Sequence, residues 1–174
     1  MANYKIDAAH SEIKFQVRHM MITNVTGTFL QFDATMDSEK PDFSDANISF
    51  EADINSITTN QEQRDGHLKS ADFFDATNHP KLTFTSTGID KVDDNDFKLH
   101  GNITLRGVTR PITLDVEYGG TATDGYGQTK SGFEMKGKIN RKDFGLNWSA
   151  LTEAGGLVVS DDVKLLMQVQ MIKQ

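Results

Sequence analysis

The sequence predicts an all-β protein, an eight-stranded antiparallel barrel with a short helical insert around residues 60–75. Three observations favour this fold class. Apolar and polar residues alternate with a period of two along most of the chain, which is typical of strands with one dry and one wet face. Turn-rich segments separate these runs. A sandwich would use similar patterns, but a barrel is favoured because many strands are long and closure removes exposed strand edges.

The alternating runs account for about eight strands. A representative run is residues 97–105, in which Phe97, Leu99 and Ile103 alternate with polar neighbours. The predicted strands cover residues 13–17, 30–36, 48–54, 82–87, 97–105, 112–118, 133–139 and 163–171.

Glycine marks two kinds of position in this pattern. Gly119–Gly120 and the run from Val92 to Asn95 predict turns between strands. Gly27, Gly101 and Gly137 lie inside strand patterns, where we expect them to allow the sharp bends that a closing sheet needs.

One segment follows a helical pattern instead. Thr59 and Glu62 have the spacing of a capping box, which predicts a helix start. Asp65 and Lys69 are spaced for an i, i+4 ion pair, and Phe73–Phe74 is expected to act as an apolar plug. One predicted helical face carries Arg64, His67, Leu68 and Ala71.

Length and composition narrow the function classes. The 174 residues favour a single domain, 1–174, and the chain has no cysteine. A net charge of −7 argues against nucleic-acid binding. No segment has the length and apolarity of a signal sequence or a membrane span, so we expect no stable membrane insertion. The expected location is the cytoplasm, or the periplasm or extracellular space if a leader is missing.

Motifs for catalysis and metal binding are lacking. The five histidines form no HExxH or HxH arrangement, and neither a nucleophile elbow nor a P-loop occurs. We therefore expect no metal, no cofactor and no catalytic residue. His67 with Asp65 is the basis of an alternative hypothesis, an enzyme acting on a small hydrophobic substrate.

Three polar features have both a structural and a functional interpretation. His19 continues the dry register of Val17, so it is either a hydrogen-bonded residue at a barrel end or a ligand contact. The stretch 64–67 is either an ion-pair cluster that fixes the helix or a clamp for a ligand head group. Asn140–Gly145 has the composition of a plain turn, in which Arg141 is a candidate for a buried ion pair.

Motifs along nearly the whole chain resemble the YceI-like family of polyisoprenoid-binding, lipocalin-like proteins. No motif is specific alone, but their order and number are. They are the segments 6–11, 15–19, 25–29, 56–59, 64–70, 72–75, 80–87, 101–109, 140–145 and 159–163.

The resemblance implies an elongated barrel with a hydrophobic tunnel, an isoprenoid ligand such as a polyprenyl phosphate or a quinone, and a homodimer. Many family members are exported, whereas this chain shows no export signal. The residues alone leave open whether the interior is packed or hollow. A third hypothesis is therefore a dimeric scaffold or stress protein with a vestigial cavity.

The expected ligand contacts combine presumed inward-facing apolar side chains with polar groups for a head group. They are Phe15, Val17, Arg18, His19, Phe32, Phe50, Arg64, His67, Leu68, Phe84, Leu99, Met135, Arg141 and Trp148.

Overall fold

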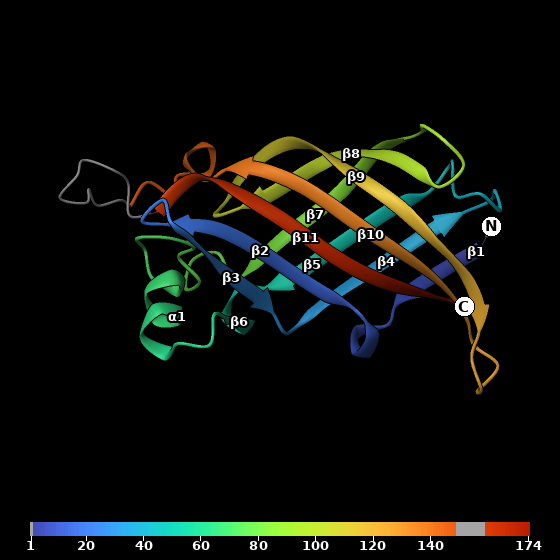
Figure 1. Cartoon of the computed structure of the whole chain (residues 1–174), viewed down its shortest axis with the longest axis horizontal. Helices are drawn as coiled ribbons and strands as arrows, with labels where there is room; N and C mark the ends of the chain where they lie inside the picture. The colour runs from blue at the N-terminus through green and yellow to red at the C-terminus, as the bar shows by residue number, and fades with distance from the viewer. Residues whose placement is uncertain (1, 149–158) are drawn as a thin grey trace.

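The computed structural model describes residues 2–148 and 159–174, and it has the closed antiparallel barrel that the sequence predicts (Figure 1). The strands are β1 (Ala2–Ile6), β2 (Glu12–His19), β3 (Thr23–Phe29), β4 (Phe32–Ser38), β5 (Asn47–Asp53), β6 (Ile57–Thr58), β7 (Lys81–Lys91), β8 (Asp96–Leu105), β9 (Val108–Thr123), β10 (Thr129–Asn140) and β11 (Val159–Lys173). The helices are η1 (Ala8–His10), η2 (Ile54–Ser56), α1 (Glu62–Lys69) and η3 (Arg141–Phe144).

The eleven strand segments occupy eight positions around the barrel. Three pairs of segments, β1 with β2, β3 with β4, and β5 with β6, are successive parts of one bent strand. β11 closes the ring, because it pairs with β10 on one side and with both β1 and β2 on the other. At the end of the barrel near α1, β6 is the last strand in the sheet order, and α1 contacts it there (Figure 1).

Alternation along each strand sets the inner face, as predicted. On β8, the residues Phe97, Leu99, Gly101, Ile103 and Leu105 are buried, and the residues between them are exposed or half-buried. This pattern is repeated around the ring. The apolar inner faces therefore meet in one core that runs along the barrel.

The sequence patterns mislead at three places in the sheet. β1 and β3 are strands that the alternation did not single out. Leu30, expected on the dry face, is 65% exposed because it lies at the bend between β3 and β4. Gly119–Gly120 is not a turn but a bulge within β9, where the register shifts against β10 and Gly120 has a φ of +112°.

The helical insert is confirmed, but its capping is different. The N-cap of α1 is Gln61, whose side chain accepts a hydrogen bond from the Arg64 N–H at 2.5 Å. Thr59 is buried, and its N–H and hydroxyl both donate to Asp65, at 2.8 and 2.5 Å. Asp65 is thus bound to Thr59 and does not form the expected ion pair with Lys69. The predicted plug is confirmed, since Phe73–Phe74 is buried.

The Asp7–Lys130 ion pair ties the segment after β1 to β10 beside the closing strand. The two side chains are 11% and 16% exposed and lie 2.7 Å apart. The hydrogen bond from Lys130 lowers the pKa of Asp7, with His10 as a second donor. Because the pKa of Asp7 is lower in the folded than in the unfolded protein, its carboxylate stabilises the fold at pH values above the pKa of an unfolded aspartate. This stabilisation is lost as the pH falls through the pKa of Asp7 in the folded protein.

We therefore predict that Asp7→Asn lowers the free energy of unfolding at neutral pH and flattens its decline below about pH 4, the usual pKa of an aspartate. Urea unfolding at a series of pH values measures both effects. Asp94→Asn, in the exposed turn after β7, is the control and should leave the curve unchanged. An Asp7→Asn curve that overlays the wild-type curve at every pH would contradict the prediction.

Candidate ligand-binding site

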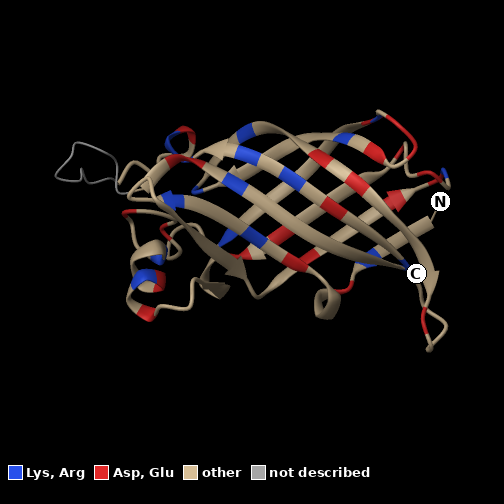
Figure 2. Ribbon diagram, in the orientation of Figure 1, with Lys and Arg blue, Asp and Glu red and all other residues tan. Residues whose placement is uncertain are grey.

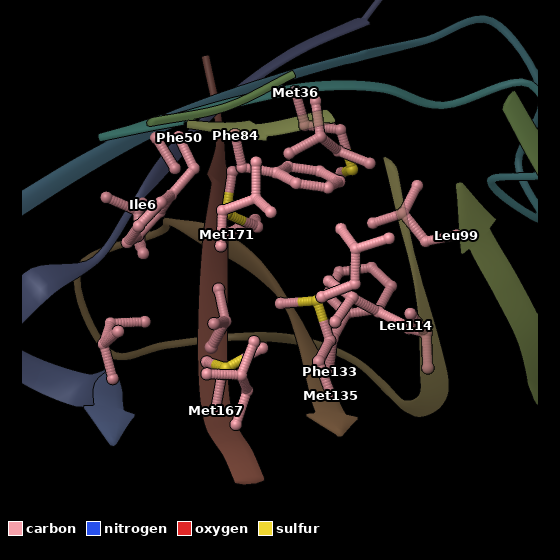
Figure 3. A pocket seen from close by; sticks show the side chains of 18 of the residues that line it. Ile6, Met36, Phe50, Phe84, Leu99, Leu114, Phe133, Met135, Met167 and Met171 are labelled. Atoms are coloured by element: carbon pink, nitrogen blue, oxygen red, sulfur yellow. The ribbon is translucent and has the colours of Figure 1, made fainter. Parts of the chain in front are cut away.

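The barrel interior holds an apolar cavity, which we call the inner chamber (Figure 3). The centre of a water molecule can occupy about 130 Å³ of this cavity. A single buried water needs roughly 10–15 Å³ by the same measure, so the cavity has room for much more than one water. Its walls are made by inward-facing side chains of most strands. Among them are Ile6, Met36, Phe50, Phe84, Leu99, Leu114, Phe133, Met135, Met167 and Met171.

Aromatic rings line the end of the inner chamber farthest from α1. Phe43 lies in the loop between β4 and β5 with a φ of +62° and is 4% exposed. Its ring packs against Tyr4, Tyr118 and Phe133, with ring centres 5.3–5.6 Å apart. Edge-on contacts of this kind are favourable for aromatic pairs. Phe43 and Phe133 line the chamber and form its floor, and Tyr4 and Tyr118 pack against them.

Glycines in the wall make room for aromatic rings. A Cβ atom on Gly27 would lie 2.2 Å from the ring of Phe15, its partner on β2, and one on Gly101 would lie 2.5 Å from the ring of Phe84. Glycine is therefore required at positions 27 and 101 by the neighbouring rings, and not only by the strand bends that the sequence predicted. Since the rings lie over bare backbone, they line the lumen without filling it.

A second cavity, the mouth chamber, lies at the end of the barrel that carries α1. About 220 Å³ of it are open to the centre of a water-sized molecule. Five residues line both chambers, so the two adjoin at a waist. The waist residues are Phe15, Phe29, Leu82, Ile103 and Leu165.

Among the described residues, Lys14 is the one polar residue that lines the inner chamber, and its ammonium group pairs with Glu12 at 3.2 Å. The mouth chamber is richer in polar groups. Besides apolar residues such as Val17, Leu68 and Phe73, its lining contains His19, Thr59, Arg64, His67 and Arg141. The lumen is therefore amphipathic along its axis, because its hydrogen-bonding side chains gather at one end.

Arg64 is held in place by Thr59. Its Nε donates to the Thr59 hydroxyl and its Nη2 to the Thr59 carbonyl, both at 2.7 Å. Asp65 in turn accepts from Thr59. Within the described residues, Arg64 has no carboxylate partner within 4.0 Å. Its positive charge thus stands at the chamber wall without a direct ion pair, and the Thr59 hydroxyl separates it from the Asp65 carboxylate.

His67 lies between aromatic rings and an acid. Its ring meets Trp148 and Phe73 edge-on, with centres 4.9 and 5.0 Å apart. Its Nε2 is 2.9 Å from the Asp72 carboxylate. The pairing of His67 with Asp65, on which the enzyme hypothesis rested, does not occur, because Asp65 is bound to Thr59.

Arg141 is buried, as the ion-pair interpretation of its turn requires. Asn140 caps η3 by accepting from the Lys142 N–H at 3.0 Å, and the Arg141 guanidinium donates to the carbonyls of Leu146, Trp148 and Ser160 at 2.6–3.0 Å. Its Nη2 is 3.6 Å from Asp161, without a hydrogen bond to any described residue. Burial lowers the pKa of Arg141, but an arginine remains charged at neutral pH.

Most of the expected ligand contacts line one of the two chambers. In the inner chamber these are Phe15, Phe50, Phe84, Leu99 and Met135. In the mouth chamber they are Phe15, Val17, His19, Arg64, His67, Leu68, Arg141 and Trp148.

Two of the expected contacts do not line a chamber. Arg18 is exposed on the outer face of β2, where its side chain donates to Asn24 at 3.5 Å. It alternates out of the lumen because Val17 and His19 face in, so the side chain expected to contact a head group does not line either chamber. Phe32 shares the inward face of β4 with Ala34 and Met36 and stacks on Phe50, with ring centres 6.4 Å apart, but it lines neither chamber.

Sequence reasoning missed several lining residues. Ile6 comes from β1, and Val25 and Phe29 come from β3, the two strands that the alternation overlooked. Phe43 and Ala46 lie in a loop whose inward course leaves no periodic signal. The methionines at 36, 167 and 171 continued predicted strand faces, and strand periodicity alone would have found them.

The described residues contain no group of three or more His, Asp or Glu side chains placed to hold a metal ion. α1 has eight residues, and no helix in the described part of the chain has both the length and the apolarity needed to span a bilayer.

The fold and lumen define a lipocalin-like β-barrel with an internal cavity. A family model described as the YceI-like domain matches residues 4–171, and the chain belongs to this family. The UPF0312 protein SAS2572 of Staphylococcus aureus (strain MSSA476) is 36% identical over 165 residues, which are 94% of each chain.

Two solved structures of similar fold extend the comparison. The YCEI protein of Campylobacter jejuni aligns with a TM-score of 0.78 and 34% identity over 88% of this chain and 87% of that one. A polyisoprenoid binding domain from Saccharophagus degradans, implicated in plant cell wall breakdown, aligns with a TM-score of 0.66 and 16% identity over 98% of both chains. At 16% identity, the similarity to the Saccharophagus degradans domain shows a shared fold only.

The contact between Gly27 and Phe15 gives a test of how the lumen wall is built. We predict that Gly27→Ala destabilises the protein by about 1–3 kcal/mol, because the new methyl group must displace the Phe15 ring. Phe15→Leu in the same chain should recover part of the loss, which a double-mutant cycle in urea unfolding measures.

Gly88→Ala on β7 is the matched control, since nothing lies within 4 Å of its Cβ position. If the Gly27 and Phe15 substitutions proved additive, the proposed ring-over-glycine contact would be wrong.

Proposed function

We propose that the protein binds one long-chain isoprenoid lipid and carries it, with the tail in the inner chamber and the head group in the mouth chamber. The observation that supports this most is a narrow apolar lumen whose polar lining residues, apart from Lys14, gather at one end. Membership of the YceI-like family and the name of the Saccharophagus degradans domain agree with it.

The inner chamber suits a hydrocarbon tail. A barrel of eight strands encloses room for one slender ligand. Met36, Met135, Met167 and Met171 point into this space (Figure 3). The methionine side chain is flexible and polarizable and adapts to irregular apolar shapes. A branched chain with repeated methyl groups therefore fits these walls without a fixed set of contacts.

Selectivity must come mainly from the head group. Burying a methylene from water is worth about 0.8 kcal/mol, so a long tail summed naively would exceed the practical affinity limit of −18 to −21 kcal/mol. Ordering of the tail offsets part of this gain. A lipid that starts in a bilayer already has an apolar environment, so moving its tail into the barrel changes little. The mouth chamber therefore decides which lipid is held.

The polar groups of the mouth chamber favour an anionic or carbonyl-bearing head. Arg64 is oriented by Thr59 and forms no direct ion pair with a described carboxylate. Guanidinium groups recognise phosphate oxygens well, because their donors form a planar fork. A polyprenyl phosphate is therefore our first candidate, and an isoprenoid quinone is the second.

Two other hypotheses are less well supported. A scaffold with a vestigial cavity predicts a filled interior, but both chambers are open. Catalysis by His67 with Asp65 lacks the pairing that motivated it. The homodimer that the resemblance implies remains a prediction.

Native mass spectrometry of the freshly purified protein tests the proposal. We expect an added mass that disappears on organic extraction, and an extract that contains an isoprenoid. Protein recovered repeatedly without ligand, which also fails to take up polyprenyl phosphate or quinone from detergent solution, would refute it.

The role of Arg64 gives a second prediction. Arg64→Gln should weaken retention of a polyprenyl phosphate by roughly tenfold, because a charge-assisted hydrogen bond is worth about 1.5–3 kcal/mol. Retention of a neutral polyprenol should hardly change. Competitive displacement in detergent measures both.

Arg18→Gln is the control, because Arg18 lies outside the lumen. Equal effects of the two substitutions, or an equal effect of Arg64→Gln on the charged and the neutral lipid, would show that Arg64 does not bind the head group.

A further inference from the structure

The hairpin between β2 and β3 ends in an exposed apolar tip, Met20–Met21–Ile22. These side chains are 44%, 64% and 70% exposed. The neighbouring residues His19 and Val25 line the mouth chamber. The tip therefore projects beside the opening of the lumen, at the end of the barrel that carries α1 (Figure 1).

The backbone of the tip makes methionine an unusual choice. The Ile22 N–H donates to the His19 carbonyl at 3.1 Å, and the two residues between them have positive φ values, 51° for Met20 and 63° for Met21. Turns with two positive φ values strongly favour Asn and Gly. At this tip, large apolar side chains instead occupy strained positions while facing solvent, so neither turn geometry nor core packing explains them.

The arginines of the chain share this end of the barrel. All five lie on elements around the mouth: Arg18 on β2, Arg64 on α1, Arg106 in the turn after β8, Arg110 on β9 and Arg141 on η3. Arg18, beside the tip, donates to the neutral Asn24, and Arg106 and Arg110 donate to the carbonyls of Gly145 and Asp143. Among the described residues, Arg141 alone of the five has a carboxylate within 4.0 Å.

Most carboxylates near the mouth are engaged, although Glu62 on α1 and Asp143 on η3 are exposed and have no ion-pair partner among the described residues. Asp65 is bound to Thr59 and Asp72 to His67, while Asp161 and Asp162 lie within 4.0 Å of basic side chains.

The opposite end is acidic (Figure 2). Its loops and strand ends carry Asp37, Glu39, Asp42, Asp45, Asp93, Asp94, Asp96 and Asp124, with Lys5, Lys40, Lys91, Lys130 and Lys173 among them. A net charge of −7 opposes adsorption to an anionic surface as a whole. Because the charge is unevenly distributed, it determines which end of the barrel approaches an anionic surface. The acidic end is repelled, and the arginine-bearing end faces the surface.

We propose that the mouth end docks reversibly on an anionic lipid bilayer, with Met20, Met21 and Ile22 inserted among the lipid tails and the exposed Arg18 and Arg110 against the head groups. Apolar side chains flanked by basic residues are the combination that binds such a surface peripherally. Docking in this orientation places the opening of the lumen at the membrane surface, where a lipid enters without crossing water. The inference goes beyond the proposed function, and it gives the carried lipid a route into the barrel.

The test uses vesicles of phosphatidylcholine alone and of equal parts phosphatidylcholine and phosphatidylglycerol. The wild-type protein should co-sediment with the mixed vesicles more than with the neutral ones. The double variant Met20→Asn/Met21→Gly has the residues that the turn prefers. It should therefore keep or raise the unfolding temperature, and it should lose roughly tenfold or more in partitioning, since removing a buried large apolar side chain is worth at least that factor.

Two further variants separate apolar insertion from charge. Arg18→Gln should weaken binding to the mixed vesicles only. Val92→Ser/Tyr126→Ser removes side chains that are 61% and 94% exposed in turns at the acidic end, and it should change nothing. If the tip variant bound mixed vesicles as well as the wild type, or if the Val92/Tyr126 variant lost as much binding, the docking surface would be wrong.

Lipid bound at equilibrium in detergent is measured separately, so that failure of the docking can be told from failure of the carrier function. The tip substitutions should not change this amount, because the tip residues do not line the lumen. Protein that holds lipid but ignores vesicles overturns the docking alone. Protein that docks but never holds lipid overturns the carrier function alone. A tip variant whose solution mass falls while its vesicle binding is unchanged would show that the tip contacts a second copy, and would also overturn the docking.

Discussion

The structure depends on the pairing of β11 with three other strands. β11 pairs with β10 along one side and with both β1 and β2 along the other, so one strand closes the ring. Closure directs the inner face of every strand toward the same axis. The period-two alternation, which in an open sheet would give one apolar surface, here gives an enclosed apolar lumen. Eight strands set its width at about that of a single chain of lipid.

The wall keeps this lumen open by pairing large residues with very small ones. The rings of Phe15 and Phe84 lie over Gly27 and Gly101, where any side chain would collide with them. Rings held flat in this way contribute apolar surface without reaching across the axis. Four methionines line the remaining space and can adjust to a ligand of irregular shape. The interior thus has room for a guest, while the backbone around it remains a closed, hydrogen-bonded sheet.

The two ends of the barrel differ in chemistry, which gives the molecule a direction. Phe43 and its aromatic neighbours form the floor at the acidic end. At the other end, the sheet gives way to α1 and to the hydrogen-bonded cluster of Thr59, Arg64 and Asp65. Head-group recognition and membrane approach are both proposed for this mouth end. They use different residues, since Arg64 faces the lumen whereas Arg18 and the hairpin tip face solvent.

The sequence by itself determined the all-β class, the inner face of strands such as 97–105, and the family, because alternation and motif order are local properties of the chain. Tertiary structure decided the rest. It placed Leu30 at a bend and Gly119–Gly120 in a bulge, tied Asp65 to Thr59, and turned Arg18 away from the lumen. It also decided that the interior is hollow. Alternation says which way a side chain points, but whether opposite side chains meet depends on the distance across the closed ring, which no local pattern encodes.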